Sequence, residues 1–147
     1  MPQEKPPQIV VIEDNPADIR LLRQALDQQE HAYELCVLTD GESALRFLGE
    51  HCQAGVHPCL IVLDLHLPRY DGAEVLRAIR STPTLTSVDV AVLTTVASPS
   101  EEAAVLALGV SLYARKPSDW DDFVALGAQL IGLCYGDKAK AAAAPPS

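Results

Sequence analysis

Five short apolar runs recur along the chain, and they constrain its fold more than any other feature. Each run has the length of a strand, and most are rich in Leu or β-branched residues. The runs cover residues 9–12, 35–38, 60–63, 90–93 and 112–114. In the first, third and fourth runs successive residues are apolar, not alternate ones. That pattern is typical of strands that are covered on both faces of a parallel sheet.

A helical segment with a recognisable start follows each run. A small polar residue precedes the first turn and an acid stands three residues later, which caps a helix. These starts lie at residues 15–18, 39–42, 71–74, 98–101 and 118–121. Alternating strands and helices predict an α/β fold of the (βα)5 doubly wound, flavodoxin-like type, with a five-stranded parallel sheet in the order 2-1-3-4-5. We expect this domain at residues 8–136, an N-terminal tail at 1–7 and a disordered Ala/Pro-rich C-terminal tail at 137–147.

Charge and hydropathy exclude several classes of partner. The chain has 20 acidic and 11 basic residues and a net charge of −9, so phosphate backbones would repel it, and we expect no nucleic-acid partner. No apolar stretch approaches the roughly 20 residues of a membrane span. The first seven residues lack the apolar centre of a secretion signal. We therefore expect a cytoplasmic protein that does not bind a membrane.

The four cysteines form no C-x-x-C pair, and most lie in or beside apolar runs. In a reducing cytoplasm we expect free thiols that behave as small hydrophobic side chains. A zinc site is the alternative, because four potential ligands cluster in one stretch. Those ligands are His51, Cys52, His57 and Cys59, and their spacing fits no usual zinc pattern.

Polar residues collect where the expected strands end. Glu13 and Asp14 follow the first run, Asp64 the third, Thr94 the fourth and Lys116 the fifth. Singly, the acids could cap helices or begin turns, Lys116 could be a surface lysine, and Thr94 could be an ordinary strand residue. Together, on one edge of a parallel sheet, they predict a shared pocket.

The charges in this pocket predict its ligands. Two carboxylates about 4 Å apart repel by roughly 4 kcal/mol at an effective dielectric near 20. A divalent cation removes that conflict, and oxygen ligands favour Mg²⁺. A lysine and a hydroxyl beside the metal can hold an anion. Carboxylates, a hard metal ion, a lysine and a hydroxyl are together typical of a phosphoryl-transfer site.

Four ordered motifs resemble those of bacterial two-component response regulators, namely of their receiver (CheY-like) domains. They are Ile12-Glu13-Asp14-Asn15, the segment 63–72, Val92-Leu93-Thr94-Thr95 and the segment 113–117. The resemblance extends over nearly the whole chain. It implies a phosphorelay signalling domain that promotes only its own phosphorylation and dephosphorylation, and not a conventional enzyme.

The resemblance also implies the role of each site residue. Asp64 would accept a phosphoryl group from the phosphohistidine of a sensor histidine kinase and become a 4-aspartylphosphate. Mg²⁺ would be bound by Asp14 and Asp64 directly, by Glu13 through water and by the backbone carbonyl of His66. Lys116 and Thr94 would contact the phosphoryl oxygens. We therefore expect Asp64, Thr94 and Lys116 to be the catalytic residues.

A conformational switch is implied as well. Thr94 would move toward the phosphoryl group and Tyr113 would fill the space behind it. A cis peptide bond is common in receivers at the position of Lys116-Pro117. Thr95 is bulkier than the usual residue at its position and could slow small phosphodonors, while His66 and Val96 would tune the lifetime of the acyl phosphate.

The segment 13–18 and the strand end Leu93-Thr94-Thr95 also resemble those of single-domain regulators that are paired with bacterial phytochromes, and other single-domain regulators share much of this pattern. The resemblance implies a bacteriophytochrome kinase as donor. The last expected helix has a second apolar stripe beside its core face, and we expect a homodimer or a kinase contact there. The stripe consists of Val124, Ala128, Ile131 and Tyr135.

Two other functions remain as alternatives. One is a receiver-like adaptor that acts without phosphorylation, although no member of the acidic set is missing. The other is a phosphatase of the haloacid dehalogenase type. Such enzymes need a second acid two residues after the nucleophile, where this chain has His66.

Overall fold

The computed structural model describes residues 6–53, 58–67 and 71–135, without the side chains of 51–53. It contains a five-stranded parallel sheet in the order β2-β1-β3-β4-β5, which confirms the predicted fold. The strands are β1 (Gln8–Ile12), β2 (Glu34–Leu38), β3 (Leu60–Asp64), β4 (Asp89–Thr94) and β5 (Leu112–Arg115). The helices are α1 (Pro16–Asp27), α2 (Gly41–Gln53), α3 (Gly72–Ser81), α4 (Pro99–Leu106) and α5 (Trp120–Cys134), and a short 3-10 helix, η1, covers Pro83–Leu85.

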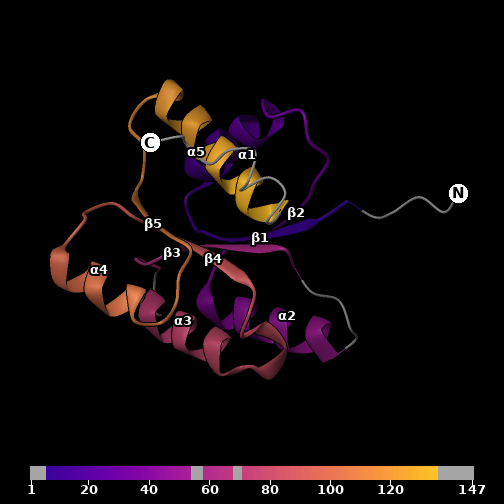
Figure 1. Cartoon of the computed structure of the whole chain (residues 1–147), viewed down its shortest axis with the longest axis vertical. Coiled ribbons are helices and arrows are strands. Elements are labelled where there is room, and N and C mark those ends of the chain that lie inside the picture. Colours follow the sequence, from indigo (N-terminus) through magenta and orange to yellow (C-terminus); the bar gives the residue numbers. More distant parts are fainter. Residues whose placement is uncertain (1–5, 54–57, 68–70, 136–147) are drawn as a thin grey trace, which may run out of the picture.

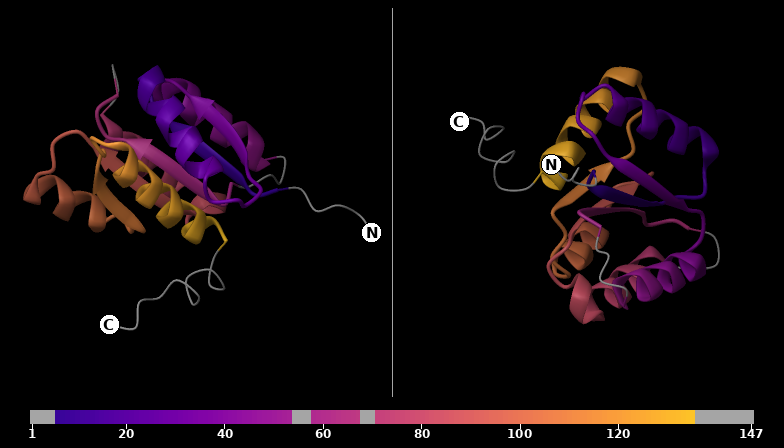
Figure 2. Two further views of the ribbon diagram at one scale, coloured as in Figure 1. Left: turned by 90° about the horizontal axis from the view of Figure 1, so that it is seen from above. Right: turned by 90° about the vertical axis from the view of Figure 1, so that its right-hand side faces the viewer.

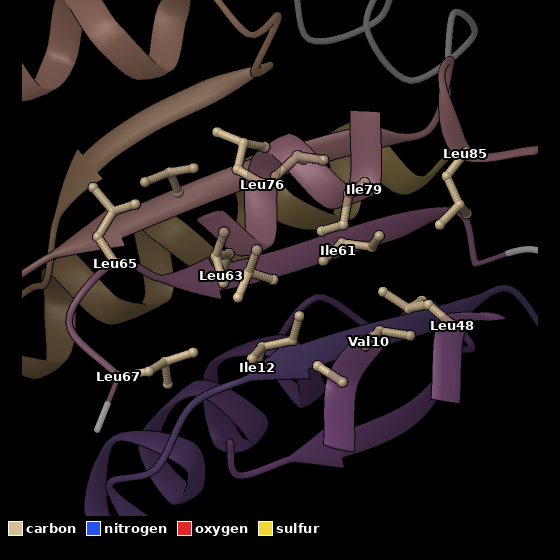
Figure 3. Packing of buried hydrophobic residues seen from close by; sticks show 14 of the residues in the cluster. Val10, Ile12, Leu48, Ile61, Leu63, Leu65, Leu67, Leu76, Ile79 and Leu85 are labelled. Atoms are coloured by element: carbon tan, nitrogen blue, oxygen red, sulfur yellow. The ribbon is translucent and has the colours of Figure 1, made fainter. Parts of the chain in front are cut away.

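The helices cover both faces of the sheet. Helices α1 and α5 lie on one face, and α2, α3 and α4 lie on the other (Figure 1; Figure 2, right). Each central strand therefore sends alternate residues into two separate cores. On β1, Val10 and Ile12 pack toward α2 and α3 (Figure 3), whereas Ile9 and Val11 pack toward α1 and α5. This two-sided burial explains why successive residues of the strand are apolar.

Side-chain caps begin the helices close to the predicted positions. Asn15 Oδ1 accepts from the backbone N–H groups of Ala17 and Asp18, and Ser98 Oγ accepts from the N–H of Glu101. Two caps lie one residue later than predicted. Asp119 caps α5, and Asp40 accepts from the N–H of Ser43 at the start of α2.

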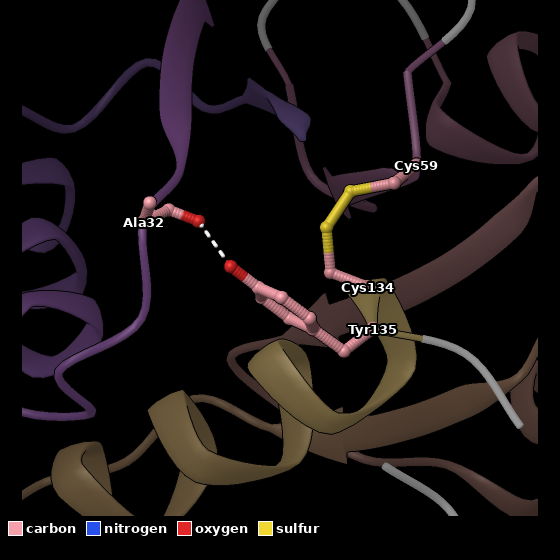
Figure 4. The surroundings of a disulfide bond; sticks show 4 residues. All are labelled: Ala32, Cys59, Cys134 and Tyr135. Carbon is pink, nitrogen blue, oxygen red and sulfur yellow. Dashed lines mark hydrogen bonds between the residues drawn. A yellow bond between two sulfur atoms is a disulfide. The ribbon is translucent and has the colours of Figure 1, made fainter. Parts of the chain in front are cut away.

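A disulfide joins Cys59, just before β3, to Cys134 at the end of α5 (Figure 4). The expectation of free thiols is therefore wrong for these two cysteines, and Cys59 is not available as a zinc ligand. His57 and the side chains of His51 and Cys52 lie outside the described residues. Cys36 is a free, half-buried cysteine, and burial raises the pKa of its thiol.

The second apolar stripe of α5 is not an open surface. Ile131 is only 4% exposed and belongs to the core between the sheet, α1 and α5. The expectation that Ile131 is available for a contact is wrong, because α5 is covered by the sheet on one side and by α1 on another. Ala128 and Tyr135 are exposed and Val124 is half-buried.

The described helices include none that is long and apolar enough to cross a membrane. Residues 1–5 and 136–147, which contain most of the two expected tails, lie outside the described residues. Pro7 already belongs to the folded part, because its carbonyl accepts from the backbone N–H of Glu34 at 2.8 Å.

Candidate metal and phosphoryl site

Three acids meet at the carboxyl ends of β1 and β3. These strands are neighbours in the sheet, with Ile12 opposite Leu63, so the residues that follow come together. One carboxylate oxygen from each of Glu13, Asp14 and Asp64 lies within 4.8 Å of the other two. Glu13 and Asp64 are 5% and 4% exposed, whereas Asp14 is exposed to solvent. The structure thus brings together the three predicted carboxylates, with one side open.

Lys116 lies among these acids. Its Nζ is 2.7 Å from Glu13 Oε1, 2.9 Å from Asp18 Oδ2 and 3.2 Å from Asp64 Oδ2. Burial alone would lower the pKa of Lys116, but hydrogen bonds to Glu13 and Asp18 and the charges of Glu13 and Asp64 outweigh burial and raise it. The lysine is therefore held in its charged form and compensates several carboxylates at once.

Asp18 was missed as a site residue by the sequence analysis. An acid in the first turn of a helix has an ordinary explanation as a partner for the helix dipole, and its reach toward Lys116 depends on how α1 packs against the sheet. The only sequence signal was its proximity to Glu13 and Asp14. Its carboxylate is one of the three, with those of Glu13 and Asp64, that contact the lysine.

The single positive charge of Lys116 does not fully balance the negative charges of the surrounding carboxylates. Burial raises the pKa of Glu13 to about 7, and the charge of Asp64 adds to this, although hydrogen bonds with Lys116 and the backbone of Asn15 oppose the rise. Buried carboxylates that resist ionisation together are relieved by a bound cation. Three oxygen donors with one open side fit a hard divalent ion that keeps part of its water shell.

Asp64 is fixed on both of its oxygens. Oδ1 accepts from the backbone N–H of His66 at 3.0 Å, and Oδ2 faces Lys116. Close packing behind this loop comes from Gly72, whose N–H donates to the carbonyl of Leu65 at 3.0 Å. A Cβ at Gly72 would lie 2.5 Å from the Leu65 Cα, so only glycine allows this approach. Residues 68–70 of the resembling motif lie outside the described residues.

Thr94 ends β4 and is fully buried. Its hydroxyl donates to the carbonyl of Val96 at 3.2 Å and lies 3.0 Å from Nε2 of His66. A hydroxyl has one hydrogen to donate, so the imidazole Nε2–H is the donor in the contact between the two side chains. The side chain of His66 thus covers the Thr94 hydroxyl.

Tyr113 is connected to Thr94 through two further side chains. The Tyr113 hydroxyl donates to Glu101 Oε1 at 3.0 Å, and Glu101 Oε2 lies 3.6 Å from His66 Nε2. The chain Thr94–His66–Glu101–Tyr113 therefore links both predicted switch residues. Glu101 was identified from sequence only as a helix-start acid, because its partners come from other elements.

The expected cis bond is not present. The described residues contain no cis peptide bond, so Lys116-Pro117 is trans, the isomer that X–Pro bonds intrinsically favour by about 0.5–1 kcal/mol. Thr95 is exposed and lines an open depression of about 800 Å³ together with Lys116 and Asp18. Thr95 therefore borders a depression next to Lys116 and Asp18, whereas Glu13, Asp14 and Asp64 are not among the residues that line it.

A parallel sheet in this order, with acids and a lysine at its carboxyl edge, is the arrangement that the sequence motifs led us to expect of a receiver domain. The model of the response regulator receiver domain matches residues 9–126, and the chain belongs to this family. The family consists of signalling domains whose standard role is a phosphorylation-dependent switch, and they bind divalent metal at an acidic pocket.

Similar proteins of known kind indicate which group of response regulators this chain resembles. The chain is 37% identical over 124 residues to the response regulator Rcp1 of Synechocystis, and the match covers 82% of this chain and 84% of Rcp1. The structure of the Mn²⁺-bound form of Rcp1 matches with a TM-score of 0.75 at 35% identity, over 83% of this chain and 89% of that one. The phosphorylated cyanobacterial phytochrome response regulator RcpA matches with a TM-score of 0.81 at 31% identity, over 97% and 99%. The chain is thus a response regulator close to phytochrome-associated single-domain regulators.

Proposed function

We propose that Asp64 accepts a phosphoryl group from a sensor histidine kinase in a Mg²⁺-dependent reaction. The observation that carries this proposal is the grouping of Asp64 with Glu13, Asp14 and Lys116 at one edge of the sheet. Lys116 contacts Asp64 Oδ2 at 3.2 Å, and a carboxylate oxygen in this position can act as the nucleophile toward phosphorus.

In the proposed transfer, a bond forms between an Asp64 oxygen and phosphorus while the P–N bond of the phosphohistidine breaks. The leaving imidazole keeps the electron pair and takes up a proton. Mg²⁺, held by Asp14, Asp64, the His66 carbonyl and, through water, Glu13, would neutralise charge on the phosphoryl oxygens. Lys116 would bind one of these oxygens, and Thr94 would donate to another.

The proposed switch uses the contacts of Thr94. To reach the phosphoryl group, its hydroxyl must give up the carbonyl of Val96 and the imidazole of His66. His66 is then free to change its contact with Glu101, which holds the hydroxyl of Tyr113. Movement of Thr94 would in this way release Tyr113 and alter the surface of α4 and β5.

Replacing Asp64 with asparagine is expected to abolish phosphorylation, because the amide cannot attack phosphorus. Intact mass is measured after incubation with Mg²⁺ and either acetyl phosphate or a phosphorylated histidine kinase. The wild type should gain one phosphoryl group, and EDTA should prevent the gain.

The matched control is Asp121→Asn, an exposed acid in the first turn of α5 that should leave the mass gain from acetyl phosphate unchanged. Because the bulk of Thr95 is expected to slow small phosphodonors, the kinase is the decisive donor. Wild-type protein that gains no mass from any phosphorylated kinase would favour the adaptor alternative.

We also propose that the donor is a bacteriophytochrome kinase and that the protein works in the cytoplasm through a receiver domain over residues 8–136. The resemblance to Rcp1 and RcpA supports the first point. The acidic charge and the absence of a long apolar helix in the described part of the chain are compatible with the second.

A homodimer through the exposed part of α5 is proposed for Ala128 and Tyr135, since Ile131 is buried. Ala128→Glu adds charge to an exposed position and should convert a dimer to a monomer in light scattering. Gln129→Glu, on the next exposed position, is the control. Identical monomer masses for wild type and Ala128→Glu would end this proposal.

A further inference from the structure

Cys59 and Cys134 lie in a position that allows a thiol pair to close. Their Cα atoms are 5.1 Å apart, inside the range of about 4.4–6.8 Å that disulfides require. The backbone of Cys59 is fixed because its N–H donates to the carbonyl of Gln8 at 2.8 Å. Both residues are half-buried and pack against the core between the sheet, α1 and α5.

The pair lies at the edge of the sheet opposite the acidic pocket. Cys59 immediately precedes the first residue of β3, whereas Asp64 is the last residue of that strand. Five residues of strand separate the two edges by roughly 16 Å. Oxidation or reduction of the pair therefore leaves the contacts of Asp64 and Lys116 in place.

The fold does not depend on this bond. Each face of the sheet has its own core of fully buried side chains, including Ile61 and Leu76 on one face and Ile9 and Leu130 on the other. A core of this extent folds without a covalent cross-link, whereas small disulfide-rich domains need one. Tyr135 gives the end of α5 a second attachment, since its hydroxyl donates to the carbonyl of Ala32 at 2.7 Å (Figure 4).

We propose that Cys59 and Cys134 form a reversible redox site that is oxidised by low-molecular-weight disulfides such as glutathione disulfide. One cysteine thiolate attacks a sulfur of the small disulfide, which forms a mixed disulfide and releases one glutathione. The second cysteine thiolate then attacks the protein sulfur of the mixed disulfide and releases the other glutathione. The protein loses two electrons and two protons, and the small disulfide gains them as two thiols.

Oxidation changes the stiffness of the end of α5. The bond joins residues 75 positions apart and fastens the last turn of the helix to the start of β3. Closing such a loop removes conformational freedom from the unfolded chain. In the oxidised form the backbone N–H of Tyr135, which donates to the carbonyl of Ile131 at 2.9 Å, should exchange with solvent more slowly.

The test uses the full chain with Cys36 and Cys52 replaced by alanine, so that only two thiols remain. The folded protein is equilibrated in mixtures of reduced and oxidised glutathione, free thiols are trapped with N-ethylmaleimide, and intact mass is measured. We expect two labels in excess reduced glutathione and none in excess glutathione disulfide, with the mass of the unlabelled form lower by two hydrogens. Circular dichroism should show the same fold in both forms.

Two single variants in the same background, Cys59→Ser and Cys134→Ser, serve as controls. In excess glutathione disulfide each single variant should form a mixed disulfide with glutathione. Neither should form the intramolecular disulfide, whose mass is lower by two hydrogens. The oxidised parent should melt about 5 °C or more above the reduced parent, whereas neither single variant should show this difference. Two labels at every glutathione ratio would overturn the proposal, and so would a bond that is reduced only when the protein unfolds.

Discussion

Replacing Arg80 with methionine is expected to destabilise the protein by about 3 kcal/mol, a large part of the roughly 5–15 kcal/mol of a typical domain. Arg80 stands at the end of α3 and donates to five backbone carbonyls in two loops. Three lie between α3 and β4, and two lie between α4 and β5. The acceptors are Leu85, Thr86, Val88, Leu108 and Gly109, at 2.9–3.2 Å.

The size of this effect follows from the number of acceptors. Methionine matches the length of the arginine stem but donates nothing, so half-buried carbonyls would lose a charged partner. Lysine has a single ammonium group and cannot span both loops, so Arg80→Lys should recover only part of the loss. Burial lowers the pKa of Arg80, but a guanidinium stays charged at any ordinary pH.

Chemical denaturation of purified variants measures the difference. Arg77→Met is the matched control, since Arg77 belongs to the same helix and is exposed. Its substitution should change the free energy of unfolding by less than about 0.5 kcal/mol. Equal losses in the two methionine variants would show that the five hydrogen bonds of Arg80 contribute little.

Gly127→Ala and Gly132→Ala are expected to have opposite effects, although both replace a glycine of α5 with alanine. At Gly127 a Cβ would lie 2.7 Å from the carbonyl oxygen of Ala25 and 2.9 Å from its carbonyl carbon, both in the backbone of α1. The two helices would have to move apart, at a cost of about 2–3 kcal/mol. At Gly132 a Cβ meets nothing within 4 Å.

Alanine at Gly132 should stabilise the protein by up to about 1 kcal/mol, because it reduces the freedom of the unfolded chain and favours the helix. Thermal unfolding of both variants, followed by circular dichroism, gives the comparison. A Gly127→Ala variant that melts at or above the wild-type temperature would contradict the close approach of α1 and α5.

Much of the fold follows from local patterns. Apolar residues at successive positions of β1 and β3 predict burial on both faces, and the caps at Asn15 and Ser98 mark where helices start. The main site was also predictable, because parallel strands place their carboxyl ends on one edge. Glu13, Asp64 and Lys116 meet there for that reason.

The features that were missed depend on tertiary packing. Asp18 reaches Lys116 only because α1 lies over the sheet, and Glu101 meets Tyr113 only because α4 packs beside β5. The pairing of Cys59 with Cys134 joins elements that are distant in sequence. Ile131 looked free because a periodic pattern does not reveal how many neighbours cover a helix.

The position of Lys116 has a consequence for how information leaves the pocket. One ammonium group is the common counter-ion of Glu13, Asp18 and Asp64, so any charge gained by one acid weakens its hold on the others. Phosphorylation of Asp64 would draw the lysine toward the new oxygens and away from Asp18. The first turn of α1 would then lose its contact with Lys116 when Asp64, at the end of β3, is phosphorylated. The change in charge would in this way affect a helix on the opposite face of the sheet from Tyr113.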